Sequence, residues 1–104
     1  WDKYFDVSGA IFIRSVLHTH RDEYLVMGYY PTGFANSEIY LINFDLNGNE
    51  LWRKIISNPN ENLRGYSMIQ ISDGGYFITG VYGNEGGNLE NTLLLKTDSD
   101  GNFE

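Results

Sequence analysis

The chain has 104 residues, the length of one small domain, and its 41% hydrophobic and 15% aromatic content is typical of a folded globular protein. Fourteen Asp and Glu against seven Lys and Arg give a net charge of −7, so neither nucleic acid nor an anionic membrane surface is an expected partner. The absence of cysteine excludes disulfides, thiolate catalysis and cysteine-based zinc sites, and no apolar run approaches the roughly 18 residues that span a bilayer.

Eight strands are predicted along the chain, because short apolar, aromatic-rich stretches stand between turn residues. No stretch combines a 3.6-residue apolar period with helix caps, so we expect almost no helix and an all-β fold. The predicted strands cover residues 1–7, 12–19, 24–30, 39–45, 50–56, 66–72, 76–82 and 91–97.

The sequence repeats itself at shifts of 51 to 53 residues. Four strands in about 50 residues is the size of one β-propeller blade, and one large ring in each repeat can fill the wedge between neighbouring blades. We therefore predict two tandem four-stranded blades, with repeat 1 at about 1–51 and repeat 2 at about 52–104. The recurring residues are Trp1 and Lys3 (as Trp52 and Lys54), Tyr24, Gly28 and Tyr30 (as Tyr76, Gly80 and Tyr82), and Leu41, Asp45, Gly48 and Asn49 (as Leu94, Asp98, Gly101 and Asn102).

Glycines mark two kinds of position in these repeats. Gly28 and Gly80 stand in mid-strand, where glycine usually allows another backbone or a large side chain to approach closely. Asn47-Gly48 and Asp100-Gly101 predict two-residue hairpins with a type I′ turn, which needs a positive φ at both positions.

A further tight turn is predicted at 73–75, Asp-Gly-Gly, and 21–23, Arg-Asp-Glu, takes its place in the first repeat. These turns divide each repeat into strands of similar length. Single-residue differences between the shifts then lie in loops, where they are tolerated.

Two segments of the second repeat resemble a bacterial and archaeal propeller-repeat family. The segment 67–80, Ser-Met-Ile-Gln-Ile-Ser-Asp-Gly-Gly-Tyr-Phe-Ile-Thr-Gly, is similar to the family's inner strand and hairpin, and 95–102, Leu-Lys-Thr-Asp-Ser-Asp-Gly-Asn, is similar to its next hairpin. The first repeat departs from the pattern at 20–23, His-Arg-Asp-Glu. The family loosely resembles quinoprotein-like propellers, so the resemblance implies a propeller without an assigned activity, in an extracellular, cell-surface or periplasmic location.

The phase of the repeat predicts how the blades are completed. Strand 1–7 corresponds to the last strand of a blade, and the blade built from 66–97 lacks such a strand. We therefore expect residues 1–7 of one protomer to complete the last blade of its neighbour and to close a homo-oligomeric ring head to tail. Since propellers have four to eight blades, two, three or four chains are candidates, and we favour a trimer or tetramer with six or eight blades. The alternative is an excised part of a longer secreted propeller, because the chain begins at Trp1 rather than Met.

No catalytic or metal centre is indicated. The Gly-x-Ser-x-Gly, His-Glu-x-x-His and phosphate-loop motifs are absent, so we predict a non-catalytic scaffold or interaction module without a cofactor. The acidic hairpins at 45–50 and 98–102 are candidates for weak calcium binding. However, an EF-hand loop has glycine at position six, whereas here glycine stands at position four. His18 and His20 share one face of a predicted strand, although no third metal ligand is evident.

The alternative function is carbohydrate binding. Aromatic and amide side chains surround two loops that are equivalent in the repeats, namely Tyr29, Tyr30 and Phe34 at the first loop and Tyr82 and Asn84 at the second. Equivalent loops lie on the same side of a propeller, and aromatic rings beside polar acceptors suit a sugar. A protein ligand is a second candidate, and the competing interpretation is that these aromatics belong to the blade core.

Overall fold

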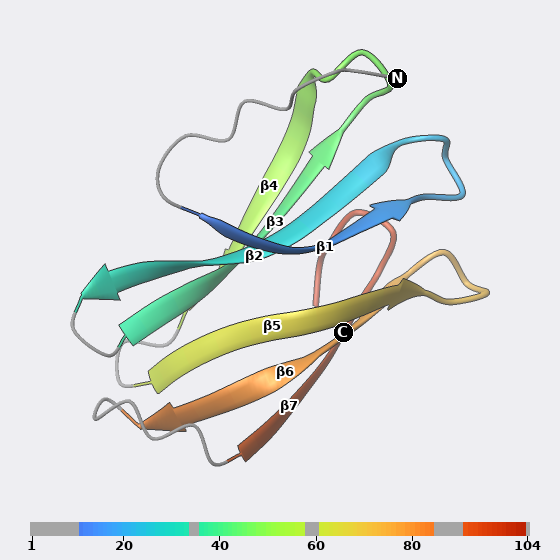
Figure 1. The fold of residues 1–104 in the computed structure, drawn as a ribbon. Helices are drawn as coiled ribbons and strands as arrows, with labels where there is room; N and C mark the ends of the chain where they lie inside the picture. Colours follow the sequence, from blue (N-terminus) through green and yellow to red (C-terminus); the bar gives the residue numbers. More distant parts are fainter. Residues whose placement is uncertain (1–10, 34–35, 58–60, 85–90, 104) are drawn as a thin grey trace.

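The computed structural model describes residues 11–33, 36–57, 61–84 and 91–103, and this part of the chain is built of antiparallel strands without a helix (Figure 1). β1 to β4 form a four-stranded sheet in sequence order, and β5 to β7 form a three-stranded sheet. The all-β prediction is confirmed, while the predicted strand 1–7 lies outside the described residues. The strands are β1 Phe12–His18, β2 Tyr24–Gly33, β3 Asn36–Phe44, β4 Glu50–Ile56, β5 Glu61–Gln70, β6 Tyr76–Asn84 and β7 Asn91–Thr97.

The two sheets are built on one plan, with β5, β6 and β7 equivalent to β1, β2 and β3. Gly28 lies opposite Tyr40 in the first sheet, as Gly80 lies opposite Leu93 in the second. The first strand of each sheet also carries an irregularity at the same place, between Ile13 and Ser15 and between Gly65 and Ser67. The sequence repeat is therefore a structural repeat.

The fourth strand differs between the two sheets. β4 pairs with β3 from Ile39 to Phe44, and the Phe44–Glu50 pair begins that ladder beside the hairpin. In the second sheet, an isolated bridge between Thr97 and Phe103 occupies the equivalent place, and the described residues add no further strand there. The predicted four-stranded second blade thus has three strands in the described part of the chain.

The sheets pack face to face, with β5 against β1, β2 and β3 (Figure 1). We call the two faces of each sheet leading and trailing, and equivalent residues of the two repeats lie on faces of the same name. The leading face of the first sheet carries Leu25 and Leu41, and its trailing face carries Val26 and Ile42, because successive strand residues point to opposite faces. The main core joins the leading face of the first sheet to the trailing face of the second. Its buried members are Leu25, Met27, Ile39 and Leu41 from the first sheet and Leu63, Met68, Tyr76 and Ile78 from the second.

The mid-strand glycines lie against a neighbouring backbone. A Cβ on Gly80 would overlap the Arg64 carbonyl oxygen, and a Cβ on Gly28 would lie 2.5 Å from the Phe12 carbonyl oxygen. Both carbonyls belong to the strand that carries the irregularity, β5 or β1. Glycine therefore leaves room for the kinked first strand of each sheet.

Four hairpin turns share one geometry, and it is not the predicted one. In the segments 19–23, 45–49, 71–75 and 98–102, the first amide donates to the fifth carbonyl oxygen and the fourth amide donates to the first carbonyl oxygen. Gly48 and Gly101 have positive φ, at 87° and 82°, whereas Asn47 and Asp100 do not. The type I′ prediction is therefore wrong, and these are longer hairpin loops with one residue in the left-handed region.

Side chains explain the choice of turn. Asp45 Oδ1 accepts hydrogen bonds from the amides of Asn47 and Asn49, and Asp98 Oδ1 accepts them from Asp100 and Asn102. A carboxylate that bonds two amides ahead of it stabilises a three-residue loop. In the turn at 19–23, Asp22 stands where Gly74 stands in the turn at 71–75, and its φ is 62°.

The contact between Trp52 and Gly101 gives a test of the inter-sheet packing. A Cβ on Gly101 would lie 2.7 Å from the Trp52 ring, whereas a Cβ on Gly74, whose φ of 91° is similar, would make an ordinary contact at 3.6 Å. We expect Gly74→Ala to lower the free energy of unfolding by about 1–2 kcal/mol through backbone strain. Gly101→Ala should cost about 1–3 kcal/mol more through overpacking. Urea denaturation measures both, and equal losses would show that Trp52 does not constrain the turn.

Candidate interaction surface

The leading face of the second sheet is apolar and open. Ile69 and Leu94 are 56% and 63% exposed, although both lie within strands, Ile69 near the end of β5 and Leu94 in the middle of β7. A shallow hollow of about 290 Å³ lies between them, and almost all of its surface is apolar. It is lined by Ser67, Met68, Ile69, Phe77, Thr79 and Leu94.

The same positions are covered in the first sheet. Leu25, Met27 and Leu41 are fully buried there by the second sheet, and Leu17 packs at the edge of this core. At the repeat shifts of 52 and 53 residues their equivalents are Phe77, Thr79, Leu94 and Ile69. Ile69, Phe77, Thr79 and Leu94 therefore occupy positions that are covered, fully or in part, where the second sheet lies on the first.

The trailing face of the first sheet carries the complementary positions. Val26 and Ile42 are equivalent to Ile78 and Leu95, which contact the first sheet in the main core. Val26, Ile42 and Phe44 form a second buried cluster, and further along this face Val16 is exposed. The outer sides of the two sheets thus carry the positions of both halves of the inter-sheet contact, but Val26 and Ile42 are already buried in the single chain, whereas Ile69 and Leu94 are open.

The predicted ligand-binding aromatics do not converge in the described structure. Tyr29 is buried and stacks on Phe12, whereas Tyr30 lies on the opposite face beside Tyr40. Tyr82 packs against the main core. The backbone of Asn84 ends β6, while its side chain and Phe34 lie outside the described residues. Carbohydrate binding stays a prediction that this arrangement does not support.

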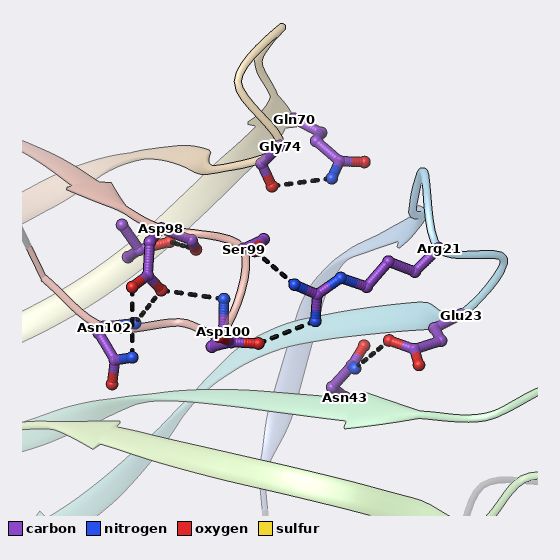
Figure 2. A network of polar contacts seen from close by, with 10 residues as sticks. Arg21, Glu23, Asn43, Gln70, Gly74, Asp98, Ser99, Asp100 and Asn102 are labelled. Carbon is purple, nitrogen blue, oxygen red and sulfur yellow. Dashed lines mark hydrogen bonds and ion pairs between the residues drawn. The ribbon is translucent and has the colours of Figure 1, made fainter.

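A polar network joins the turn at 19–23 of the first sheet to Gln70 and the turn at 98–102 of the second (Figure 2). Arg21 donates to Asp100 Oδ1 at 2.8 Å and to Ser99 Oγ at 2.6 Å, and the Asp100 contact raises the pKa of the Arg21 guanidinium. The His20 amide donates to Gln70 Oε1 at 2.8 Å. These bonds connect turns that lie about 50 and 80 residues apart in the sequence, so they fix how the sheets lie on each other.

Three of the candidate metal ligands, His18, Asp45 and Asp98, have protein partners. His18 Nε2 contacts Asp22 Oδ1, and the Asp45 and Asp98 carboxylates accept amide protons of their own turns. Among the described residues no three His, Asp or Glu side chains gather closely enough to hold a metal ion.

The turn carboxylates predict how acid acts on the fold. The amide of Asn102 lowers the pKa of Asp98, and the amide of Gly75 lowers that of Asp73, with Lys96 contributing. Because the folded-state pKa is below the ordinary value, each carboxylate stabilises the fold above about pH 4, and this contribution is lost as the pH falls through the folded-state pKa. Urea midpoints measured from pH 6 down to pH 2 should fall, and Asp98→Asn should flatten that fall. An unchanged profile in this variant would contradict the assignment.

Comparisons with protein-family models, with curated proteins and with solved structures gave no match. No helix in the described part of the chain is long and apolar enough to cross a membrane. The fold and surface together define an all-β protein of two repeated, packed antiparallel sheets with an open apolar face. Sequence analysis did not single out Ile69, Phe77 and Leu94, although their equivalence to leucines of the first repeat is the signal that identifies them.

Proposed function

We propose that the chain is a non-catalytic β-propeller subunit that associates with copies of itself. Each sheet is one blade, and the leading face of the second sheet docks on the trailing face of the first sheet of the next copy. The observation that carries this proposal is the equivalence of the open hollow to the face that is buried inside the chain. An exposed apolar surface of this kind marks an interaction site, and the repeat indicates which surface fits it.

A contact of this type is head to tail, because it joins two different faces. Each added copy presents a new open face, so the assembly ends only where the rotation per copy closes a ring. With two blades per chain and four to eight blades in known propellers, two to four chains complete a ring, and we favour three or four. The family resemblance favours the same architecture and an extracellular or cell-surface location for it.

The outer edge of β7 is the place where a strand from a neighbouring copy would pair with the second sheet. Beyond the Thr97–Phe103 bridge, the described residues leave the outer edge of β7 unpaired. Residues 1–3 match 52–54 of β4, so we assign the fourth strand of the second blade to residues 1–7 of the adjacent copy. Leu41 lies opposite Lys54 in the first sheet. The equivalent pair is Leu94 opposite Lys3 of the neighbour.

The face contact is tested by the mass of the assembly in solution. Light scattering on the native chain should give three or four times 11.9 kDa. The double variant Ile69→Asp, Leu94→Asp places charges in the apolar contact and should give a folded monomer. The dissociation constant between copies should rise at least 100-fold. Leu46→Asp is the control, since Leu46 is also an exposed apolar residue, at 42%, but lies in a hairpin turn. A folded monomer of the native chain would overturn the ring and favour part of a longer propeller.

The strand assignment is tested by cross-linking, because the chain contains no cysteine. Residues directly opposite each other in a ladder are close enough for a disulfide. The variant Lys3→Cys, Leu94→Cys should therefore form covalent oligomers under mild oxidation, visible on denaturing gels and absent after reduction. Lys3→Cys with Leu46→Cys is the control and should stay uncross-linked. A disulfide within one monomer, or none at all, would contradict strand exchange between copies.

A further inference from the structure

Two arginines and three aromatic rings gather where β1 and β5 meet, and we name this group the arginine–aromatic cluster: Phe12, Arg14, Tyr29, Arg64 and Tyr66. The Arg14 guanidinium carbon lies 5.4 Å from the centre of the Tyr29 ring and 5.2 Å from that of Tyr66. The Arg64 guanidinium carbon lies 5.2 Å from the Tyr29 ring centre. Phe12 stacks on Tyr29 with ring centres 5.3 Å apart.

The arginines of this cluster differ from the other two arginines, Arg21 and Arg53, and from Lys96. Arg21, Arg53 and Lys96 each form an ion pair with a carboxylate. Arg14 and Arg64 form none with any described residue, and Arg14 donates only to the Tyr29 hydroxyl, at 3.4 Å. In a chain with a net charge of −7, two unpaired guanidinium groups on one ring are a local concentration of positive charge.

Arg64 also lacks a hydrogen-bond partner that its burial requires. Its Nε atom is buried and has no acceptor among the described residues. A buried donor without an acceptor destabilises the fold, and a bond to an ionised acceptor is the strongest way to satisfy it. Cation–π contacts use the planar face of a guanidinium and leave its N–H edge free for such a bond.

We infer that the arginine–aromatic cluster binds a small organic oxyanion, whose carboxylate or phosphate group accepts hydrogen bonds from Arg14 and Arg64. The apolar part of such a ligand has rings to lie on, because Phe12 and Tyr66 are 52% and 42% exposed. A long polyanion is disfavoured, since it would meet the acidic remainder of the surface. All five residues belong to one chain, so the site does not depend on ring formation.

The two repeats contribute unequal residues to this site. At a shift of 52, Phe12 is equivalent to Arg64, and Arg14 is equivalent to Tyr66. Each strand thus supplies one arginine and one aromatic residue in opposite order, and in each strand the pair flanks the start of the irregularity, at 13–15 or 65–67. The site therefore occurs once per chain and is not repeated on each blade.

The inference is tested by NMR of the arginine Nε–H groups, with Arg21 and Arg53 as internal controls. The probes are benzoate, phenyl phosphate and inorganic phosphate, each titrated at constant ionic strength with chloride replaced, so that general screening does not change. We expect saturable shifts of the Arg14 and Arg64 signals with either aromatic probe. Shifts that are linear to the highest concentration, or equal at all four arginines, would overturn the site.

Variants separate a built site from general charge attraction. Arg14→Gln should weaken benzoate or phenyl phosphate binding about tenfold or more, and Arg14→Lys should weaken it less, because lysine keeps the charge but loses the planar pair of donors. Arg53→Gln removes an equal charge elsewhere and should leave binding unchanged. If Arg53→Gln weakens binding as much as Arg14→Gln, the proposed site is wrong.

The aromatic part of the inference has its own readout. Tyr66→Leu should weaken phenyl phosphate binding severalfold and leave inorganic phosphate binding unchanged. Equal affinity of the native chain for phenyl phosphate and inorganic phosphate would overturn the organic part of the assignment. Comparison of benzoate with phenyl phosphate then identifies the oxyanion that the two arginines prefer.

Discussion

The fold depends on one contact, in which the leading face of the first sheet lies on the trailing face of the second. Leu25, Met27 and Leu41 are fully buried in the core that the first sheet forms with the second, where β5 contacts β2 and β3. Each such side chain contributes about 1.5–3 kcal/mol when it leaves water. Gly65 permits the close approach, since a Cβ there would lie 2.6 Å from the Met27 sulfur. A single sheet of three or four strands has no other way to cover an apolar face.

The same contact accounts for the open surface. A repeated sequence carries each face twice, but two sheets can pair leading with trailing face only once. One leading face, with Ile69 and Leu94, is therefore left in solvent for a reason that lies in the repeat rather than in local sequence. In repeat proteins stability comes from interfaces between neighbouring units, and a terminal unit normally carries a polar outer face, so an apolar outer face is unusual. The open face is thus a consequence of two-fold repetition, and assembly is one way to cover it.

Local sequence predicted the strands well and the turns and site less well. Strands from residue 12 onward followed from short apolar runs between turn residues, and both are local signals. The turn type depended on the Asp45 and Asp98 carboxylates, which select the longer loop. Tyr29 and Tyr30 are adjacent in sequence, but strand alternation sends them to opposite faces. The arginine–aromatic cluster needs β5 to lie beside β1, a contact that no local pattern contains.

Apolar burial is non-directional, so polar groups set the relative orientation of the two sheets. Inside the chain, the Arg21–Asp100 pair fixes how one sheet lies on the next. At the repeat shifts, a contact between copies would place Asp73 where Arg21 stands and Asn47 where Asp100 stands. The ion pair is therefore not reproduced, although the apolar positions are. Since burial of apolar area supplies most of the strength of such contacts and exposed ion pairs supply little, the proposed junction between copies would keep the main attraction. It would differ from the internal junction in the polar contacts that set orientation, so the two junctions would be chemically distinct.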